Sequence, residues 1–234
     1  MKMVEEIGSN IRRFLDTLHT EMACLGRARG PVSIVAVSKT FGPEYVDAAV
    51  AGGLAEFGEN RVQEARDKIP RIQIASGLRW HLIGHLQANK ARDAVTLFDL
   101  IHSVDDLVLA RALDQRAAQI GKRQDILIQV NTSAEPQKSG CDPDEVDELA
   151  GEIATLPHLR VMGLMTIGPF FTDAAPVAHA FRLLRQAFDR LAVADLRGGA
   201  MRYCSMGMTD DWRIALAEGS NMLRIGRGIF GERA

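Results

Sequence analysis

Apolar residues recur with two different periods along this chain. Near its start they lie three or four positions apart, at Val4, Ile7, Ile11, Leu15, Leu18 and Met22, with acidic and polar residues between them. This spacing lines them up along one side of a helix, so it predicts an amphipathic helix over residues 1–22. Beyond it, short apolar runs of strand length alternate with longer segments of helical pattern.

Eight of the short runs predict β-strands. They are Ser33–Val37, Leu54–Phe57, Leu78–Ile83, Phe98–His102, Asp125–Val130, Leu159–Leu164, Met201–Cys204 and Met222–Ile225. The predicted helices between them are Pro43–Ala51, Arg61–Ile74, Asn89–Leu97, Leu107–Ile120, Pro143–Thr155, Ala174–Ala192 and Asp210–Ala217. A repeated strand-then-helix order requires parallel strands with right-handed crossovers. The pattern therefore predicts a closed (β/α)8 TIM barrel with an additional N-terminal helix, as a single domain over residues 1–234.

An open doubly wound sheet is the alternative architecture, because it also alternates strands with helices. Such a sheet usually carries a glycine-rich turn after its first strand. Here that turn reads VSKTFGPE, without the G-x-G-x-x-G pattern. The barrel is therefore the favoured prediction.

Composition and charge narrow the functional class. A formal net charge of -2, with 47% hydrophobic and 25% charged residues, indicates a globular protein without the basic field that captures nucleic acid. Cys24, Cys141 and Cys204 match no metal-binding spacing and are interpreted as free cytosolic thiols. No segment reaches the roughly 20 apolar residues that span a bilayer, and the first helix lacks the apolar region of a signal peptide. We expect a cytoplasmic protein with no membrane or nucleic-acid partner.

Polar residues follow the predicted strands, where the active face of a barrel lies. Lys39 follows the apolar run SIVAV after one residue, Ser38, so its amine would enter a largely apolar barrel mouth. Desolvation there favours the neutral amine, which can attack an aldehyde. A solvated surface lysine is the alternative interpretation of Lys39.

The loops after the seventh and eighth runs have the composition of a phosphate site. Ser205 is followed by Gly207 and by Thr209 as a candidate helix cap, while Gly226 and Gly228 permit close backbone approach to a ligand. Barrels commonly hold phosphate in these two loops. Plain tight turns are the alternative. Together with Lys39, the loops predict a site for a phosphate cofactor that bears an aldehyde.

The same residues belong to motifs that resemble those of the pyridoxal 5'-phosphate (PLP) homeostasis protein family, single-domain relatives of the alanine racemase barrel. The motifs extend from about Ile34 to Phe230. They are AVSKT at 36–40, FGENRVQEA at 57–65, WHLIGHLQANK at 80–90, HSVD at 102–105, IQVNTSAEPQKSG at 128–140, VMGLMTI at 161–167, CSMGMTDDW at 204–212 and LRIGRGIFG at 223–231.

The resemblance implies that PLP is held as a Schiff base on Lys39, with Arg224 facing its pyridine nitrogen. It implies phosphate contacts from Ser205 and from the backbone amides of Gly226 and Arg227. It further places Asn60, His81, Ile83, Met165 and Met206 in the cofactor site. For His81, a hydrogen-bonded core histidine is an equally good interpretation.

The resemblance also implies a role in vitamin B6 homeostasis. Members of the family are similar to PLP carriers without an established reaction, so PLP-dependent apoenzymes are candidate acceptors, and we expect a monomer. Lys138 resembles a lysine typical of the family that takes part in PLP transfer, although a solvated loop lysine is the alternative. The family usually has Thr or Ser where this chain has Arg227, and we expect its guanidinium to contact the phosphate instead.

Two other functions remain as alternatives to a carrier. One is a PLP-dependent amino-acid racemase, and the other is a barrel enzyme that uses Lys39 for Schiff-base chemistry on a phosphorylated sugar. A charged Arg224 beside the pyridine nitrogen disfavours protonation of that nitrogen and weakens the electron sink that racemisation needs, although a rim salt bridge is another possible role for Arg224. A two-base racemase also uses a tyrosine from a second domain, which we do not expect in this chain. The histidines and paired acids show no metal-ligand spacing, so we predict no metal.

Overall fold

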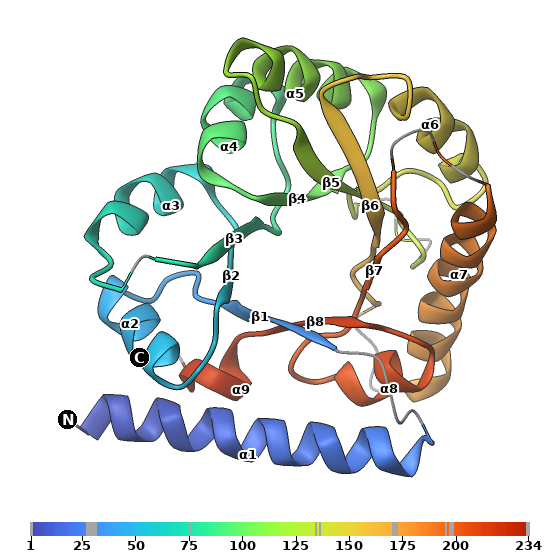
Figure 1. The fold of residues 1–234 in the computed structure, drawn as a ribbon. Helices are drawn as coiled ribbons and strands as arrows, with labels where there is room; N and C mark the ends of the chain where they lie inside the picture. Colours follow the sequence, from blue (N-terminus) through green and yellow to red (C-terminus); the bar gives the residue numbers. More distant parts are fainter. Residues whose placement is uncertain are drawn as a thin grey trace.

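The computed structural model describes residues 2–26, 32–74, 76–133, 135, 137–169, 173–194, 196 and 199–232. Eight parallel strands form a closed barrel in which each strand pairs with its neighbours in sequence and β8 pairs with β1. Helices surround the barrel, and the amino-terminal helix lies across its outside (Figure 1). The predicted (β/α)8 TIM barrel with an additional N-terminal helix is confirmed. Residue 1 of the predicted first helix lies outside the described residues, and so do residues 134 and 136 of the 128–140 motif.

The strands lie close to the predicted runs. They are β1 Ser33–Val37, β2 Glu56–Glu59, β3 Arg79–Leu82, β4 Leu100–Val104, β5 Gln124–Gln129, β6 Leu159–Met165, β7 Tyr203–Ser205 and β8 Met222–Ile225. The helices are α1 Lys2–Cys24, α2 Pro43–Ala51, α3 Val62–Lys68, α4 Ala91–Leu97, α5 Leu107–Gln119, α6 Val146–Ile153, α7 Ala174–Val193, α8 Trp212–Ala217 and α9 Arg227–Phe230. Short 3-10 helices, η1 Ile69–Arg71 and η2 Ala88–Lys90, adjoin α3 and α4.

The predicted boundaries of β2 and β4 are wrong by two residues. Strand β2 was predicted from its apolar residues at 54–57, but pairing with β1 and β3 continues through Gly58 and Glu59. Gly58 fits because an added Cβ would lie 2.9 Å from a methyl group of Val35 on β1. Strand β2 thus extends through a small and a charged residue, and β4 extends past the polar Ser103 to Val104, so the apolar runs do not mark where these strands end.

Buried apolar side chains form two layers. One fills the inside of the barrel and comprises Val35, Leu100, Leu127, Met162, Met165, Tyr203 and Met222. The larger layer lies between the strands and the surrounding helices, and it includes the rings of Phe57 and Trp80, whose centroids are 5.5 Å apart. Successive side chains of a strand point to opposite faces, so each strand contributes to both layers.

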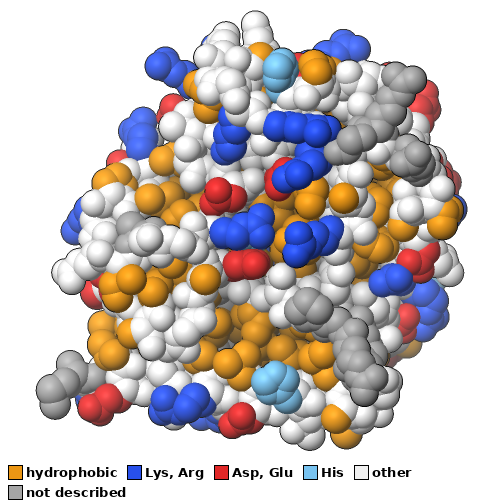
Figure 2. All heavy atoms as spheres, in the orientation of Figure 1, with side chains coloured by type: hydrophobic (Ala, Val, Ile, Leu, Met, Phe, Trp, Pro, Cys, Tyr) orange, Lys and Arg blue, Asp and Glu red, His pale blue; other side chains and the backbone are white. Residues whose placement is uncertain are grey.

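The end of the barrel that faces the viewer in Figures 1 and 2 carries the amino ends of the strands. Figure 2 shows Lys and Arg side chains mixed with acidic ones around the barrel axis at this end. The contacts there include a bidentate ion pair between Arg160 and Asp125, at 2.6 and 2.8 Å. Arg79 also donates a hydrogen bond to the Tyr203 hydroxyl. Among the described residues, no helix is long and apolar enough to cross a membrane.

Candidate functional site

A cavity of about 600 Å³ opens at the carboxyl ends of the strands. Six of the ten predicted site residues line it: Lys39, Asn60, Ile83, Arg224, Gly226 and Arg227. They come from β1, β2, β3 and β8 or from the residues just after these strands. A pocket of this size, lined by mixed apolar and polar groups, suits a small organic ligand.

The alternation of strand residues explains why Lys39 reaches the cavity. Val35 lies inside the barrel and Val37 lines the cavity, so Lys39 continues the inward-facing series of β1. The same period connects Arg224 on β8 with Gly226, which directly follows this strand. These inward positions place a lysine amine, a guanidinium and a glycine-bordered loop around one space.

A buried ionic cluster supports the backbone on both sides of Lys39. The Lys68 ammonium on α3 donates to the Ser38 carbonyl at 2.8 Å, to Glu59 Oε1 at 2.7 Å and to Glu64 Oε1 at 3.0 Å. The Ser38 hydroxyl donates to the same Glu59 oxygen at 2.6 Å. On the other side, the Thr40 N–H donates to Glu64 Oε1 at 2.5 Å.

This cluster matters because the turn is strained. Thr40 has a φ of 70°, in the left-handed region that non-glycine residues rarely adopt. Burial raises the pKa of Glu59, while its bonds to Lys68 and Ser38 oppose that shift. At Glu64 burial also raises the pKa, but the hydrogen bonds from Lys68 and Thr40 outweigh it and lower the pKa. At both glutamates, the contact with Lys68 thus favours the charged form of the carboxyl group.

Arg224 is the cation built into the wall of the cavity. Its side chain is buried, and its guanidinium donates to the Ser205 hydroxyl and to the Thr166 carbonyl, each at 2.8 Å. Burial lowers its pKa to about 10, and the charge of Asp211 acts in the opposite direction. Arg224 therefore stays protonated at neutral pH and places a positive charge in the wall of the cavity.

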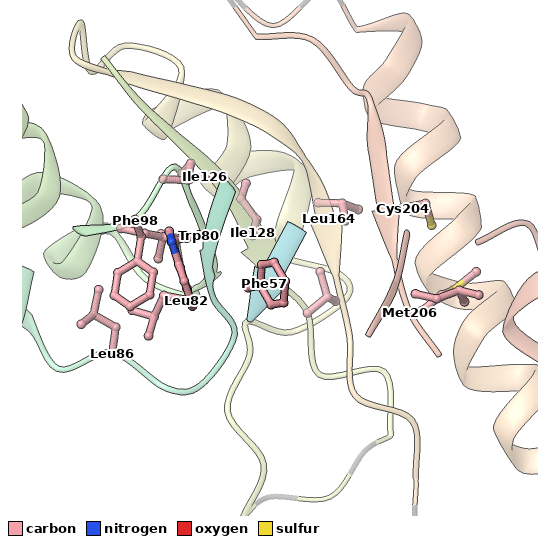
Figure 3. Packing of buried hydrophobic residues seen from close by; sticks show 14 of the residues in the cluster. Phe57, Trp80, Leu82, Leu86, Phe98, Ile126, Ile128, Leu164, Cys204 and Met206 are labelled. Carbon is pink, nitrogen blue, oxygen red and sulfur yellow. The ribbon is translucent and has the colours of Figure 1, made fainter. Parts of the chain in front are cut away.

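Four predicted site residues do not line the cavity. Ser205 lies behind Arg224 and accepts its hydrogen bond, Met165 belongs to the layer inside the barrel, and His81 contacts His102. Met206 points the other way, into the layer between strands and helices, where Figure 3 shows it beside Cys204. Alternation along β7 explains the separation: Tyr203 lies inside the barrel and Cys204 outside, and the alternation continues through Ser205 at the end of the strand to Met206 just after it.

Arg227 lines the cavity, but its guanidinium pairs with two acids. It forms ion pairs with Asp210, which also lines the cavity, and with Glu232 at 3.3 Å. Arg227 is half-exposed, with 47% of its side chain accessible. The expected phosphate contact thus competes with an acid from the neighbouring loop.

Several residues of the cavity wall were not predicted as site residues. Thr209 was expected to cap the following helix, but α8 begins at Trp212 with Asp211 as its N-cap, and Thr209 lines the cavity beside Met208. The remaining lining residues are Val37, Gly84, His85, Gln129, Val130, Asn131, Lys138, Ser139, Ile167 and Asp210. Their common signal is a position at a strand end, which the barrel topology makes informative.

Lys138 contacts the opposite side of the cavity. Its ammonium donates to the Gly168 carbonyl at 3.0 Å and pairs with Glu135 at 2.6 Å. Among the described residues, no group of three or more His, Cys, Asp or Glu side chains could hold a metal ion. Within the described part of the chain, the cavity lining includes a single carboxylate, that of Asp210, together with Lys39, Lys138, Arg224 and Arg227.

The chain is similar to known proteins over nearly its full length. The family model of the alanine racemase N-terminal domain matches residues 15–234. The pyridoxal phosphate homeostasis protein of Escherichia coli (strain K12) is 39% identical over 98% of both chains, and that of Aquifex aeolicus is 36% identical over 95% of this chain and 96% of its own.

Solved structures of related proteins are also similar to this chain. PipY of Synechococcus elongatus, solved with PLP bound, is 37% identical and superimposes with a TM-score of 0.80 over 91% of this chain and 99% of its own. An alanine racemase of Clostridium difficile, 14% identical, shares the fold alone, with a TM-score of 0.72 over 100% of this chain and 57% of its own. The chain therefore belongs to the alanine racemase N-terminal domain family and, within it, to the pyridoxal phosphate homeostasis proteins.

Proposed function

We propose that this protein binds PLP in the cavity as a Schiff base on Lys39 and takes part in PLP homeostasis without catalytic turnover. The observation that carries the proposal is the meeting of Lys39 and Arg224 on one cavity wall beside the loops after β7 and β8. PLP carries an aldehyde for the amine and a phosphate for the loop amides. The PLP-bound PipY structure and the names of the curated relatives support it.

The residues of the cavity have separate roles in this proposal. Lys39 supplies the amine, and the strained turn held by Lys68 keeps it at the wall. The amides of Arg227 and Gly228 precede the first donor inside α9, Ile229, so they are available to the phosphate. When bound, PLP supplies an electron sink, and Arg224, which stays protonated, keeps the pyridine nitrogen unprotonated. A carrier that supplies PLP to apoenzymes has to hold the cofactor in this way and does not need to catalyse a reaction.

A test is reduction with borohydride followed by peptide mapping. The purified protein incubated with PLP should absorb in the visible range and carry the pyridoxyl label on Lys39. Lys39→Ala should lose both signals, whereas Lys90→Ala, which removes an exposed lysine of η2, should keep them. A label found mainly on Lys138 would refute the assignment.

A PLP-dependent racemase is the second candidate, because His85 and Asp210 also line the cavity and carry groups that could act as a second base. Neither of the two tyrosines lines the described cavity: Tyr203 bonds to Arg79, and Tyr45 packs on Phe41. We expect single L-amino acids to keep their configuration during long incubation with the PLP-loaded protein. Racemisation near a typical enzyme rate of about 10 per second would instead establish the second candidate.

A further inference from the structure

A chain of five polar side chains crosses the inside of the barrel behind the cavity wall. It runs from Arg224 through Ser205, His102 and His81 to Glu56. The contacts are Arg224 Nη1 to Ser205 Oγ at 2.8 Å, Ser205 Oγ to His102 Nδ1 at 3.4 Å, and His102 Nε2 to His81 Nδ1 at 2.9 Å. His81 Nε2 lies 3.6 Å from Glu56 Oε2. Ser205 and both histidines are fully buried.

The chemistry of arginine favours one direction for this chain. A guanidinium has donors and no acceptor, so the Ser205 oxygen must accept from Arg224. The one hydroxyl proton of Ser205 is then available to His102 Nδ1. With Nδ1 as acceptor, a neutral His102 carries its proton on Nε2 and donates to His81 Nδ1. His81 in turn carries its proton on Nε2, which points toward Glu56.

The far end of the chain is consistent with this direction. His81 Nε2 and Glu56 Oε2 are both buried atoms that have no hydrogen-bond partner within the described part of the chain. A donor and a carboxylate oxygen facing each other at this distance need only a small adjustment to form the bond. Burial raises the pKa of Glu56, while the nearby charges of Arg79 and Arg202 oppose that shift. A hydrogen bond donated by His81 Nε2 would therefore stabilise the carboxylate of Glu56.

The two imidazoles are neutral at neutral pH, and the positive charge of the chain lies on Arg224. Burial, with a smaller contribution from Arg79, lowers the pKa of His81 to about 3. Burial also lowers the pKa of His102 well below its ordinary value, with contributions from His81 and Arg224. At neutral pH the chain therefore contains one buried cation, and the neutral histidines serve as hydrogen-bonding groups behind it.

We propose that Ser205 and His102 are positioning residues for Arg224, and that His102 and His81 both carry their proton on Nε2, so that a directed hydrogen-bond chain connects the cavity wall with Glu56. The chain orients the guanidinium toward the cavity without contributing charge of its own. The proton positions of the two histidines do not depend on any ligand. The positioning of Arg224 for the cofactor rests on the proposed binding of PLP.

The proton positions can be tested on the protein without cofactor. Nitrogen-15 NMR of the histidine side chains separates Nε2–H from Nδ1–H imidazoles, and substitution of His81 and His102 in turn assigns their signals. We expect both to be neutral Nε2–H forms from pH 5 to 9. Nδ1–H forms at both positions would show the opposite direction, with a protonated Glu56 as the first donor, and would overturn the proposal, as would a charged imidazole.

The positioning role can be tested with Ser205→Ala. Loss of a hydrogen bond to a charged group should raise the dissociation constant of PLP about tenfold and shift the absorbance maximum of the bound cofactor. The matched control is Ser220→Ala, which also removes a buried hydroxyl, one that donates to the Met206 carbonyl at 2.7 Å and has no described contact with Arg224. The control should lose stability but keep the spectrum and the affinity.

The two proposals fail in different ways. If the parent protein does not take up PLP on Lys39, the proposed function is wrong, while the NMR result stands by itself. If the parent binds PLP but Ser205→Ala and Ser220→Ala give the same spectrum and affinity, the positioning role alone is wrong.

Discussion

Lys68 illustrates how a single residue outside the cavity controls the residue inside it. Its ammonium is 5% exposed and connects the Ser38 carbonyl with two glutamates. Nothing in the spacing of Lys68 from Lys39 along the sequence indicates this contact. It arises because Glu59 points outward from β2 and meets α3, while Asn60 points inward.

We predict that Lys68→Met lowers the free energy of unfolding by about 3–5 kcal/mol, because it leaves Glu59 buried without its cation. Urea denaturation of the protein without cofactor measures this loss. Lys90→Met, at an exposed position on η2, should change stability by less than about 0.5 kcal/mol. A loss below about 1 kcal/mol for Lys68→Met would mean that the cluster is not held by its charges.

Arg227 and Asp210 form a second residue-scale system at the mouth of the cavity. We predict that Arg227→Ala releases PLP faster and with weaker salt dependence, because one cation near the phosphate is lost. Asp210→Asn should slow release, because the guanidinium is then free to turn to the phosphate. Stopped-flow transfer of PLP to an excess apoenzyme at two salt concentrations measures both. Equal release from the parent and Arg227→Ala would show that the side chain serves only its acidic partners.

At the scale of elements, the contact between β6 and β7 depends on one glycine. Gly163 has a φ of 147° and pairs with Tyr203, whose carbonyl oxygen would overlap an added Cβ. The irregular register between β5 and β6 lies beside it. A residue without a side chain is therefore required where the strand bends toward its neighbour.

We predict that Gly163→Ala destabilises the protein by about 3 kcal/mol or more, through backbone strain and displacement of β7. Gly151→Ala is the matched control. Gly151 lies in the exposed face of α6 with open space around its Cα, so alanine should stabilise the helix by up to about 1 kcal/mol. Thermal unfolding of both variants gives the comparison. Similar melting temperatures would contradict the role assigned to Gly163.

At the scale of the whole molecule, the two buried histidines make stability depend on pH. Burial disfavours the charged form of both histidines. The charge of Arg79 adds to this effect on the pKa of His81, and His81 and Arg224 add to it on the pKa of His102. Both pKa values are lowered in the folded state, whereas the unfolded chain takes up a proton on each histidine below about pH 6.5. The unfolded state therefore binds more protons, and the contribution to stability is present above that pH and lost below it.

We predict that the free energy of unfolding falls by about 1.4 kcal/mol per pH unit for each of the two histidines between roughly pH 6 and pH 4. Urea titrations at several pH values measure the slope. His81→Gln should reduce it by the equivalent of about one proton. An unchanged slope would show that His81 titrates equally in the folded and unfolded states.

Periodicity in the sequence determined the architecture, because a barrel requires eight apolar runs separated by amphipathic helices, and both patterns are local. It also indicated the functional end of the barrel, since Lys39, Arg224 and Gly226 stand at strand ends and line the cavity. The ends of β2 and β4 were missed, because pairing between strands extends β2 through Gly58 and Glu59 and β4 past the polar Ser103 to Val104.

Only the tertiary structure decided which residues support that end. Strand alternation sends Met206 outward and Ser205 inward, and barrel closure brings Ser205 on β7 next to Arg224 on β8 and His102 on β4. Lys68 reaches Ser38 across 30 positions of sequence. Such contacts depend on the stagger of neighbouring strands and on the position of a helix over them, and these distances in space leave no periodic trace in the sequence.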